Sequence, residues 1–343
     1  MQNTKGEWQK VITRLHNRKN FANYDLATQA IRKLGYPDFY KNATIVDAYS
    51  GAGVFSAALH NELNPSTHII LEPLKGYYKF LKILERPNVF VEDLDPFRWG
   101  SFGTLREQGK LAPEEQPYSQ VHNKLLFVAN LSHPQGEQLT AQYLNCISNR
   151  SWLEKYGRVR LLLWMRAKVA EKLVANAGEL GRHRMAVQRD SCCDVRVVFH
   201  EPFSSKANSG AQGYPALLKT PLCEYDYKRD VKAQSHSPLS LIELTPKEQE
   251  VENLDEFEYV NKMLFISRST PLRASLNTLG PGGSDDLAEP LKDLLDKVPT
   301  DLTIPELERI VKAFVNWPFR PDFLHNFYEE ALMGRGSNED KHF

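Results

Sequence analysis

The sequence predicts an α/β protein with a doubly wound, mainly parallel sheet and a small helical domain at its carboxyl end. Short apolar runs rich in β-branched residues alternate with helical patterns through the first half of the chain, and a glycine-containing turn follows the first run. The 343 residues, of which 41% are hydrophobic and 25% charged, are enough for one large core and a smaller domain.

The expected elements follow one another in a regular order. The apolar runs predict strands at residues 43–49, 67–72, 88–93, 124–130 and 159–165. The patterns between them predict helices at 76–84, 136–147 and 167–177. The stretch 203–238 has many Ser, Gly, Pro and Lys residues and is expected to be irregular, and a further strand is predicted at 240–244.

An acidic segment and a proline-punctuated tail complete the chain. We expect residues 1–252 to form the sheet domain and 253–343 the helical domain. The motif NWPFRPD predicts a hinge between helices with Trp317 and Phe319 packed. The last ten residues, 334–343, lack apolar periodicity, which predicts a disordered tail.

The charge of the chain is balanced in total but uneven along its length. Lys plus Arg and Asp plus Glu both number 43, so the whole chain has no net attraction for phosphate. Residues 151–189 carry nine basic and three acidic residues, whereas 240–301 carry thirteen acidic and six basic ones. This pattern is typical either of one face that meets nucleic acid or of chance clustering on a solvated surface.

Composition also limits the classes of ligand. The four cysteines form no CxxC pair and have no companion His spacing, so we expect reduced thiols and no metal site. No apolar run reaches membrane-spanning length, so we expect no membrane partner. At the amino terminus, Trp8, Val11, Ile12 and Leu15 share one face of a basic amphipathic pattern, typical of an organelle-targeting segment or of a first helix packed on the domain.

The turn after the first strand is the strongest candidate for a ligand site. In VDAYSGAGVFSAAL, Gly51 and Gly53 would let backbone amides approach an anionic or adenosyl ligand, and Glu72 ends the second strand, where ribose hydroxyls are commonly held. Nicotinamide enzymes and methyltransferases share such glycines. The nicotinamide fingerprint GxGxxG requires a glycine where this chain has Ser56, which disfavours a nicotinamide-dependent oxidoreductase.

Taken in order, the motifs resemble those of the ribosomal RNA adenine dimethyltransferases and of the mitochondrial transcription factors B that descend from them. The matching segments are RKNFANYDLATQAI with Asn20 and Phe21, VDAYSGAGVF, ILEP, VEDLDP, VANLSH, SPLSLIEL and FISRSTPLRASLNTLG. Three further segments, LLLWM, DPFRW and NWPFRPD, resemble the fungal factors. The resemblance implies a Rossmann-like class I methyltransferase fold.

The resemblance also implies a site for S-adenosylmethionine. Its cofactor-binding candidates are Asn20, Gly51, Gly53, Glu72, Asp93 and Asn130. The chain departs from the family pattern at Tyr49, where a phenol ring replaces the first glycine and would crowd the donor. It departs again at Ser132 and His133, which replace the Pro and the aromatic residue of the Asn-Leu-Pro-aromatic motif that holds a flipped adenine. We therefore expect no methyl transfer and no required cofactor, with an active S-adenosylmethionine-dependent rRNA adenine N6-dimethyltransferase as the alternative.

For the non-enzymatic alternative, the resemblance implies transcription initiation in the mitochondrial matrix. Such a factor would join the single-subunit mitochondrial RNA polymerase at promoter DNA, assist melting and hold the single-stranded non-template strand. In DPFRWGSFG, Phe97 and Trp99 flank Arg98, and in extended chain both rings would face one way as a stacking platform for bases, unless Trp99 fills the core. Lys172, Arg182 and Arg184 are candidate phosphate contacts, or members of a solvated turn.

Overall fold

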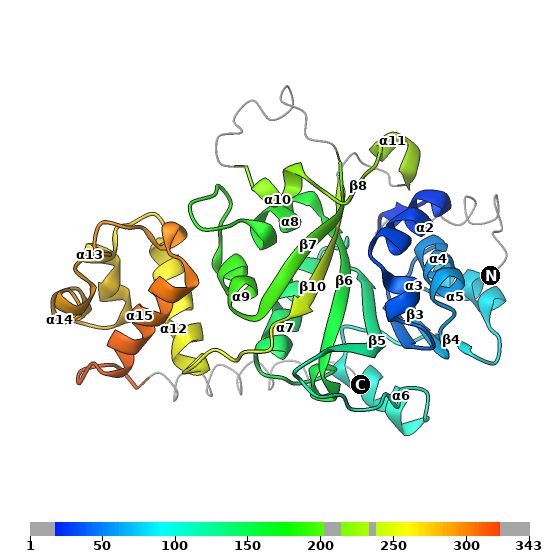
Figure 1. The fold of residues 1–343 in the computed structure, drawn as a ribbon, viewed down its shortest axis with the longest axis horizontal. Coiled ribbons are helices and arrows are strands. Elements are labelled where there is room, and N and C mark those ends of the chain that lie inside the picture. Colours follow the sequence, from blue (N-terminus) through cyan, green and yellow to red (C-terminus); the bar gives the residue numbers. More distant parts are fainter. Residues whose placement is uncertain (1–17, 202–213, 233–237, 323–343) are drawn as a thin grey trace, which may run out of the picture. The chain divides into compact units, whose positions relative to one another are not determined.

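The computed structural model describes residues 18–201, 214–232 and 238–322 (Figure 1). The chain divides into two compact units between Glu250 and Val251, two residues before the expected boundary. We call residues 18–250 unit 1 and residues 251–322 unit 2. The amphipathic pattern at residues 8–15 and the tail 334–343 lie outside the described residues.

An eight-stranded sheet forms the frame of unit 1, which confirms the predicted fold class. The strand order is β4-β3-β2-β5-β6-β10-β7-β8, and β10 runs antiparallel between β6 and β7 in an otherwise parallel sheet. Its strands are β2 (Thr44–Ala48), β3 (Thr67–Leu71), β4 (Val89–Glu92), β5 (Val121–Asn130), β6 (Arg158–Arg166), β7 (Cys193–His200), β8 (Cys223–Glu224) and β10 (Leu239–Pro246). A separate antiparallel pair joins β1 (Asn20–Phe21) to β9 (Val231–Lys232).

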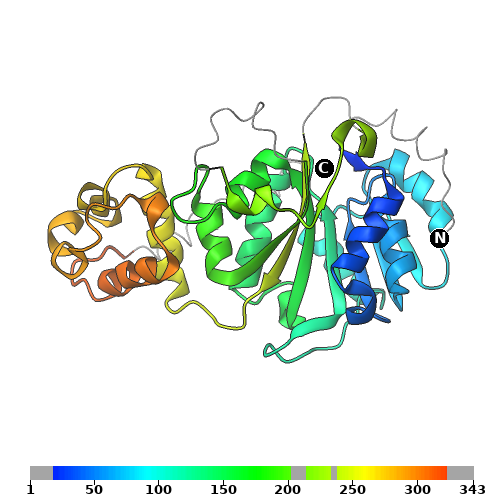
Figure 2. The same cartoon turned by 45° about the horizontal axis from the view of Figure 1, so that its top comes forward.

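Helices cover both faces of this sheet (Figure 2). One face packs against α2 (Tyr24–Lys33), α3 (Tyr36–Phe39), α4 (Val54–Leu63) and α5 (Lys75–Leu81). The other packs against α6 (Trp99–Glu107), α7 (Gly136–Ser148), α8 (Ala167–Val174), α9 (Arg184–Cys192) and α10 (Ala216–Lys219). Because side chains alternate along a strand, Phe127 of β5 joins the second core and its neighbour Val128 the first.

The expected irregular stretch contains more regular structure than the sequence indicated. Helix α10, strand β8, helix α11 (Tyr227–Asp230) and strand β9 all lie within residues 216–232. Strand β7 and helix α9 were also not predicted. Strand β8 pairs only with Phe199 and His200, so the first half of β7 has one neighbouring strand and a polar sequence that hides the strand pattern.

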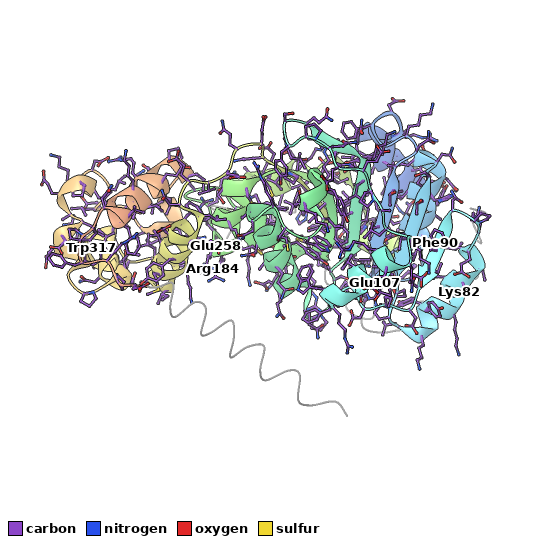
Figure 3. All side chains as sticks on the ribbon, turned by 90° about the horizontal axis from the view of Figure 1, so that it is seen from below. Lys82, Phe90, Glu107, Arg184, Glu258 and Trp317 are labelled. Atoms are coloured by element: carbon purple, nitrogen blue, oxygen red, sulfur yellow. The ribbon has the colours of Figure 1, made fainter. Side chains whose placement is uncertain are left out.

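Unit 2 is helical, as expected. Its helices are α12 (Leu254–Leu264), α13 (Leu272–Ser275), α14 (Gly283–Asp286) and α15 (Ile304–Val315). The Trp317 side chain lies within this unit (Figure 3), where it is 4% exposed and its indole N–H donates to Asp286 Oδ2 at 2.8 Å. The expected packing of Phe319 is wrong, because the Arg320 N–H bonds the Trp317 carbonyl and the resulting turn leaves the Phe319 ring 73% exposed.

The described segments were expected to lack membrane-spanning helices, metal sites and disulfides. None of the helices there is long and apolar enough to cross a membrane. Across the same segments, no group of three or more His, Cys, Asp or Glu side chains is arranged to hold a metal ion. The four cysteines are buried free thiols, and Cys192 Sγ lies 3.6 Å from Cys193 Sγ.

The buried Glu154 makes the stability of unit 1 dependent on pH. Its Oε2 accepts hydrogen bonds from the Val159 N–H and the Tyr118 hydroxyl, while Oε1 has no partner among the described residues. Burial raises the pKa of Glu154 well above its ordinary value. The folded state therefore binds this proton more tightly than the unfolded state, so stability falls as pH rises through the range between the two pKa values.

We predict that Glu154→Gln raises the melting temperature at pH 8, because the neutral amide avoids the cost of a buried carboxylate. The difference from the unmodified chain should shrink toward about pH 3.5, below the ordinary pKa of a glutamate, where the carboxyl group is mostly protonated in both states. Glu107→Gln, at an exposed position of α6, is the control and should change neither value. A Glu154→Gln effect of the same size at both pH values would contradict the prediction.

Candidate functional site

The glycine turn lies at the carboxyl edge of the sheet, where the strand order reverses. Strand β2 pairs with β3 on one side and β5 on the other, which is the position where open α/β sheets bind ligands. Gly51 and Gly53 have φ of 61° and 73°, a left-handed conformation that favours glycine. Gly53 leads directly into α4, and a Cβ there would lie 2.6 Å from Leu81 Cδ2.

Glu72, the candidate ribose ligand, is fully buried and paired inside the protein. Its carboxylate accepts two hydrogen bonds from the Arg18 guanidinium, at 2.5 and 2.7 Å. The Gly51 N–H donates to the same carboxylate at 3.0 Å and the Leu74 N–H at 2.9 Å. Arg18 and these two amides therefore occupy the Glu72 oxygens that a ribose would need.

Asn20 occupies the other side of the glycine turn. Its side-chain oxygen accepts from the Ala52 N–H at 3.0 Å, and its amide nitrogen donates to the Tyr77 hydroxyl at 2.8 Å. A Cβ built on Gly51 would overlap this oxygen, so the Asn20 carboxamide takes up the space beside the glycine. The backbone amides of Gly51 and Ala52 thus bind side chains of the chain itself.

Asn130 and Ser132 form a hydrogen-bonded pair at the end of β5. The Asn130 side-chain oxygen accepts from the Ser132 hydroxyl at 2.7 Å and from the Ser132 N–H at 3.2 Å. The Asn130 amide donates to the Lys19 carbonyl at 2.8 Å, and the Lys19 N–H donates to the Ser132 hydroxyl. Burial and the nearby Arg166 guanidinium lower the pKa of the Lys19 ammonium to about 8. A proline at 132 would supply neither of the donors that Asn130 uses here.

Tyr49 fills the space beside this pair. It is 5% exposed and adopts a φ of 58°, which is uncommon for a residue with a side chain. Its ring lies 4.7 Å from the His133 ring, and the Arg18 Cζ lies 4.9 Å from the Tyr49 ring centroid. Burial and a hydrogen bond to Asp95 raise the pKa of Tyr49, and burial lowers the pKa of His133. Both rings are therefore neutral at physiological pH.

These contacts leave little space for a donor molecule. The pocket beneath the turn offers about 20 Å³ to the centre of a water molecule and is lined by Asn20, Asp47, Ser50, Asn130 and Trp164, among others. That space suits one or two waters, whereas pockets for drug-sized ligands measure roughly 300–1,000 Å³. This pocket, as the described residues line it, is therefore too small for S-adenosylmethionine. Asp93, the remaining candidate for binding S-adenosylmethionine, directly follows β4 and is exposed.

Residues 95–99, which we call the DPFRW loop, follow β4 and enter α6. The loop is a turn and not extended chain, because the Arg98 N–H donates to the Asp95 carbonyl at 3.0 Å. Phe97 consequently packs against the core, Arg98 is exposed, and the Trp99 side chain is 42% exposed at the start of α6. The Trp99 ring also contacts this core, at 5.6 Å from the Trp152 ring and 6.4 Å from the Tyr143 ring between centroids. Phe97 is the more buried of the two rings, so Trp99 with Arg98 forms the accessible part of the loop.

The candidate phosphate contacts in α8, in α9 and in the turn between them differ in their surroundings. Arg182 is 1% exposed, and its guanidinium bonds Asp190 at 2.6 Å and the Ala175 carbonyl at 3.0 Å, so its assignment as a phosphate contact is wrong. Lys172 pairs with Glu137 at 2.7 Å, and Arg184 is exposed at the start of α9. Figures 1 and 3 both show α6 and α9 separated along the longest axis, so these residues do not join the DPFRW loop in one patch.

Several residues of the site were not predicted. Arg18 and Tyr77 pair with Glu72 and Asn20 from distant positions, and a single sequence gives no signal for such pairs. Asp95 had a detectable signal, because an Asp followed by Pro and a helix start often accepts a hydrogen bond from the backbone two residues on. It accepts from the Phe97 N–H at 3.0 Å.

Known proteins are similar to this chain in sequence and in fold. The model of the ribosomal RNA adenine dimethylase family matches residues 14–312. Mitochondrial transcription factor 1 of Lachancea kluyveri is 32% identical over 91% of this chain and 92% of that protein, and its counterpart in Saccharomyces cerevisiae is 31% identical over 83% of each. A dimethyladenosine transferase structure from Plasmodium falciparum, 15% identical, covers 86% of this chain and 97% of its own with a TM-score of 0.56, which supports the fold.

The matches cover nearly the whole chain, and the curated relatives carry mitochondrial names. The chain therefore belongs to the ribosomal RNA adenine dimethylase family, within which it is a mitochondrial homologue of the yeast mitochondrial transcription factor 1 proteins.

Proposed function

We propose that this protein is a non-enzymatic mitochondrial transcription initiation factor. It joins the single-subunit mitochondrial RNA polymerase at promoters, assists duplex melting and holds the unpaired non-template DNA strand. The observation that carries the proposal is that two features occur together. Trp99 and Arg98 are exposed, and the site where a methyl donor would bind is occupied by the protein's own side chains. The similarity to yeast mitochondrial transcription factor 1 over most of the chain supports the same function.

The DPFRW loop supplies the contact to DNA in this proposal. The Trp99 residue is 42% exposed, so the part of its indole that does not contact Trp152 and Tyr143 is available to an unpaired base, and the neighbouring guanidinium can pair with a phosphate. Stacking contributes about 1–3 kcal/mol per base, while opening costs on the order of 1.4 kcal/mol per base-pair step. One stacked base therefore offsets a useful share of the melting cost at one step.

The arrangement of Asn130 supports the absence of methyl transfer. In the dimethyltransferases of this family, the oxygen of the corresponding Asn accepts hydrogen bonds from the target amine. Here the Asn130 oxygen accepts two hydrogen bonds from Ser132. An oxygen with two donors in place has lost the acceptor capacity that the reaction requires. Glu72 and Asn20 are similarly paired, so no cofactor is required for the proposed function.

An active rRNA adenine N6-dimethyltransferase is the second candidate, favoured by the retained Gly51, Glu72 and Asn130. It would have to replace the Arg18–Glu72 pair and move Tyr49 before a donor could enter. Incubation with labelled S-adenosylmethionine and small-subunit ribosomal RNA distinguishes the two candidates. Incorporation that Asn130→Ala abolishes would establish the enzyme and overturn our proposal.

We predict that Trp99→Ala reduces promoter-dependent transcription with the cognate polymerase by about 5- to 150-fold on duplex DNA, the equivalent of one lost stacking contact. The loss should be much smaller on a template already melted around the start site, because the variant fails chiefly at opening. Run-off transcription on the two templates measures both effects. Equal losses on both templates would remove strand capture from the proposal.

Two control variants accompany this experiment. Trp99→Phe keeps an aromatic face and should retain most of the activity. Phe319→Ala removes an aromatic ring that is 73% exposed in unit 2 and should not show the duplex-specific loss. A duplex-specific loss in Phe319→Ala would mean that exposed aromatic area in general is responsible and not the DPFRW loop.

We also predict that S-adenosylmethionine leaves the melting temperature of the protein unchanged. A ligand present at 100 times its dissociation constant would stabilise the folded state by about 2.7 kcal/mol, and a filled pocket gives no such site. Thermal melts with and without the donor provide the measurement. A concentration-dependent increase in melting temperature would show that the site opens and would favour the enzyme.

A further inference from the structure

A single hydrogen bond connects the filled donor site to the DPFRW loop. The Tyr49 hydroxyl donates to Asp95 Oδ1 at 2.8 Å, across 46 residues of sequence. Tyr49 belongs to the glycine turn after β2, and Asp95 begins the loop that carries Trp99. The residue that takes the place of a donor-site glycine is thus bonded to the loop with the exposed indole.

Asp95 in turn determines the shape of the loop. Its Oδ1 also accepts from the Phe97 N–H at 3.0 Å, and its carbonyl accepts from the Arg98 N–H at 3.0 Å and the Ser101 hydroxyl at 2.7 Å. These bonds make the turn and begin the first turn of α6. Because Trp99 is the first residue of α6, its backbone position follows from where Asp95 is held, and its ring then rests against Trp152 and Tyr143.

Tyr49 is itself held firmly. Its N–H donates to the Leu71 carbonyl at 2.8 Å, and its ring contacts the Arg18 guanidinium and the His133 ring. Arg18 is anchored by the buried Glu72. The backbone of Tyr49 has a positive φ, which is strained for a residue other than glycine. Such strain persists only where the surrounding contacts enforce it. The hydroxyl group is therefore presented to Asp95 from a rigid support.

We infer that Tyr49 is a positioning residue for strand capture: by filling the donor site it holds Asp95, and through Asp95 it orients Trp99 toward unpaired DNA. This inference rests on the proposed function. Replacement of the family's glycine by Tyr49 would then have two effects. The phenol ring excludes a methyl donor, and its hydroxyl group orders the DNA-binding loop. In this inference Tyr49 itself makes no contact with DNA.

The test is a double-mutant cycle on the complex of the full chain with its polymerase. Duplex promoter DNA carries 2-aminopurine in the non-template strand near the start site, and fluorescence reports opening. Tyr49→Phe, which removes only the hydroxyl, should lower the opening equilibrium by about three- to tenfold, the effect of one lost hydrogen bond. In a Trp99→Ala background the same substitution should have no further effect, because the two residues act through one contact.

Substitutions at Asp95 provide an independent reading. Asp95→Asn keeps an oxygen acceptor and should behave as the unmodified protein, whereas Asp95→Ala should match or exceed the loss in Tyr49→Phe. Two outcomes would overturn the inference even if Trp99→Ala alone impairs promoter opening. In one, Tyr49→Phe opens the promoter as fully as the unmodified protein. In the other, the losses of Tyr49→Phe and Trp99→Ala multiply in the double variant. If Trp99→Ala has no effect by itself, the proposed function fails first, and the inference fails with it.

Discussion

The buried ion pair between Arg18 and Glu72 is the interaction on which the rest of the site depends. Both side chains are almost completely excluded from water, so each charge is tolerated only because the other is present. Removing one partner of such a pair typically costs about 3–5 kcal/mol. The pair holds residues 18–21 across the carboxyl edge of the sheet, which brings Asn20 to the Ala52 amide and the Lys19 backbone to Asn130 and Ser132.

That segment converts a ligand-binding edge into a rigid support. In an open α/β sheet the loops after neighbouring strands usually surround a ligand and move when it binds. Here the loops after β2 and β3 bind each other, and the end of β5 binds the amino-terminal segment, through direct hydrogen bonds. With these loops and the end of β5 held in place, the loop after β4 can present a large exposed ring without becoming disordered.

The sequence predicted the parts of this structure that depend on local pattern and missed those that depend on distant pairing. The parallel strands follow from continuous apolar runs, because a strand covered by helices on both faces is buried along most of its length. Helices α7 and α8 follow from apolar periodicity. Strand β7 was missed because half of it lies at an edge, and Arg182 was misassigned because its partner Asp190 becomes adjacent only in the folded turn. Glu72 was located correctly, but its partner Arg18 lies 54 residues away in sequence.

The same distant pairings change how the charge of the chain is understood. Of the basic residues between 151 and 189, Arg182 and Arg189 share Asp190, Lys172 pairs with Glu137, and Arg166 bonds the Ser132 carbonyl. Positive charge that is committed to internal partners neutralises few phosphates, so these four residues are expected to add little electrostatic affinity for DNA. In the proposed function the protein must therefore obtain its hold on DNA from base stacking at Trp99 and from delivery by the polymerase. A factor of this kind would act with the polymerase during opening, by holding bases as they become unpaired.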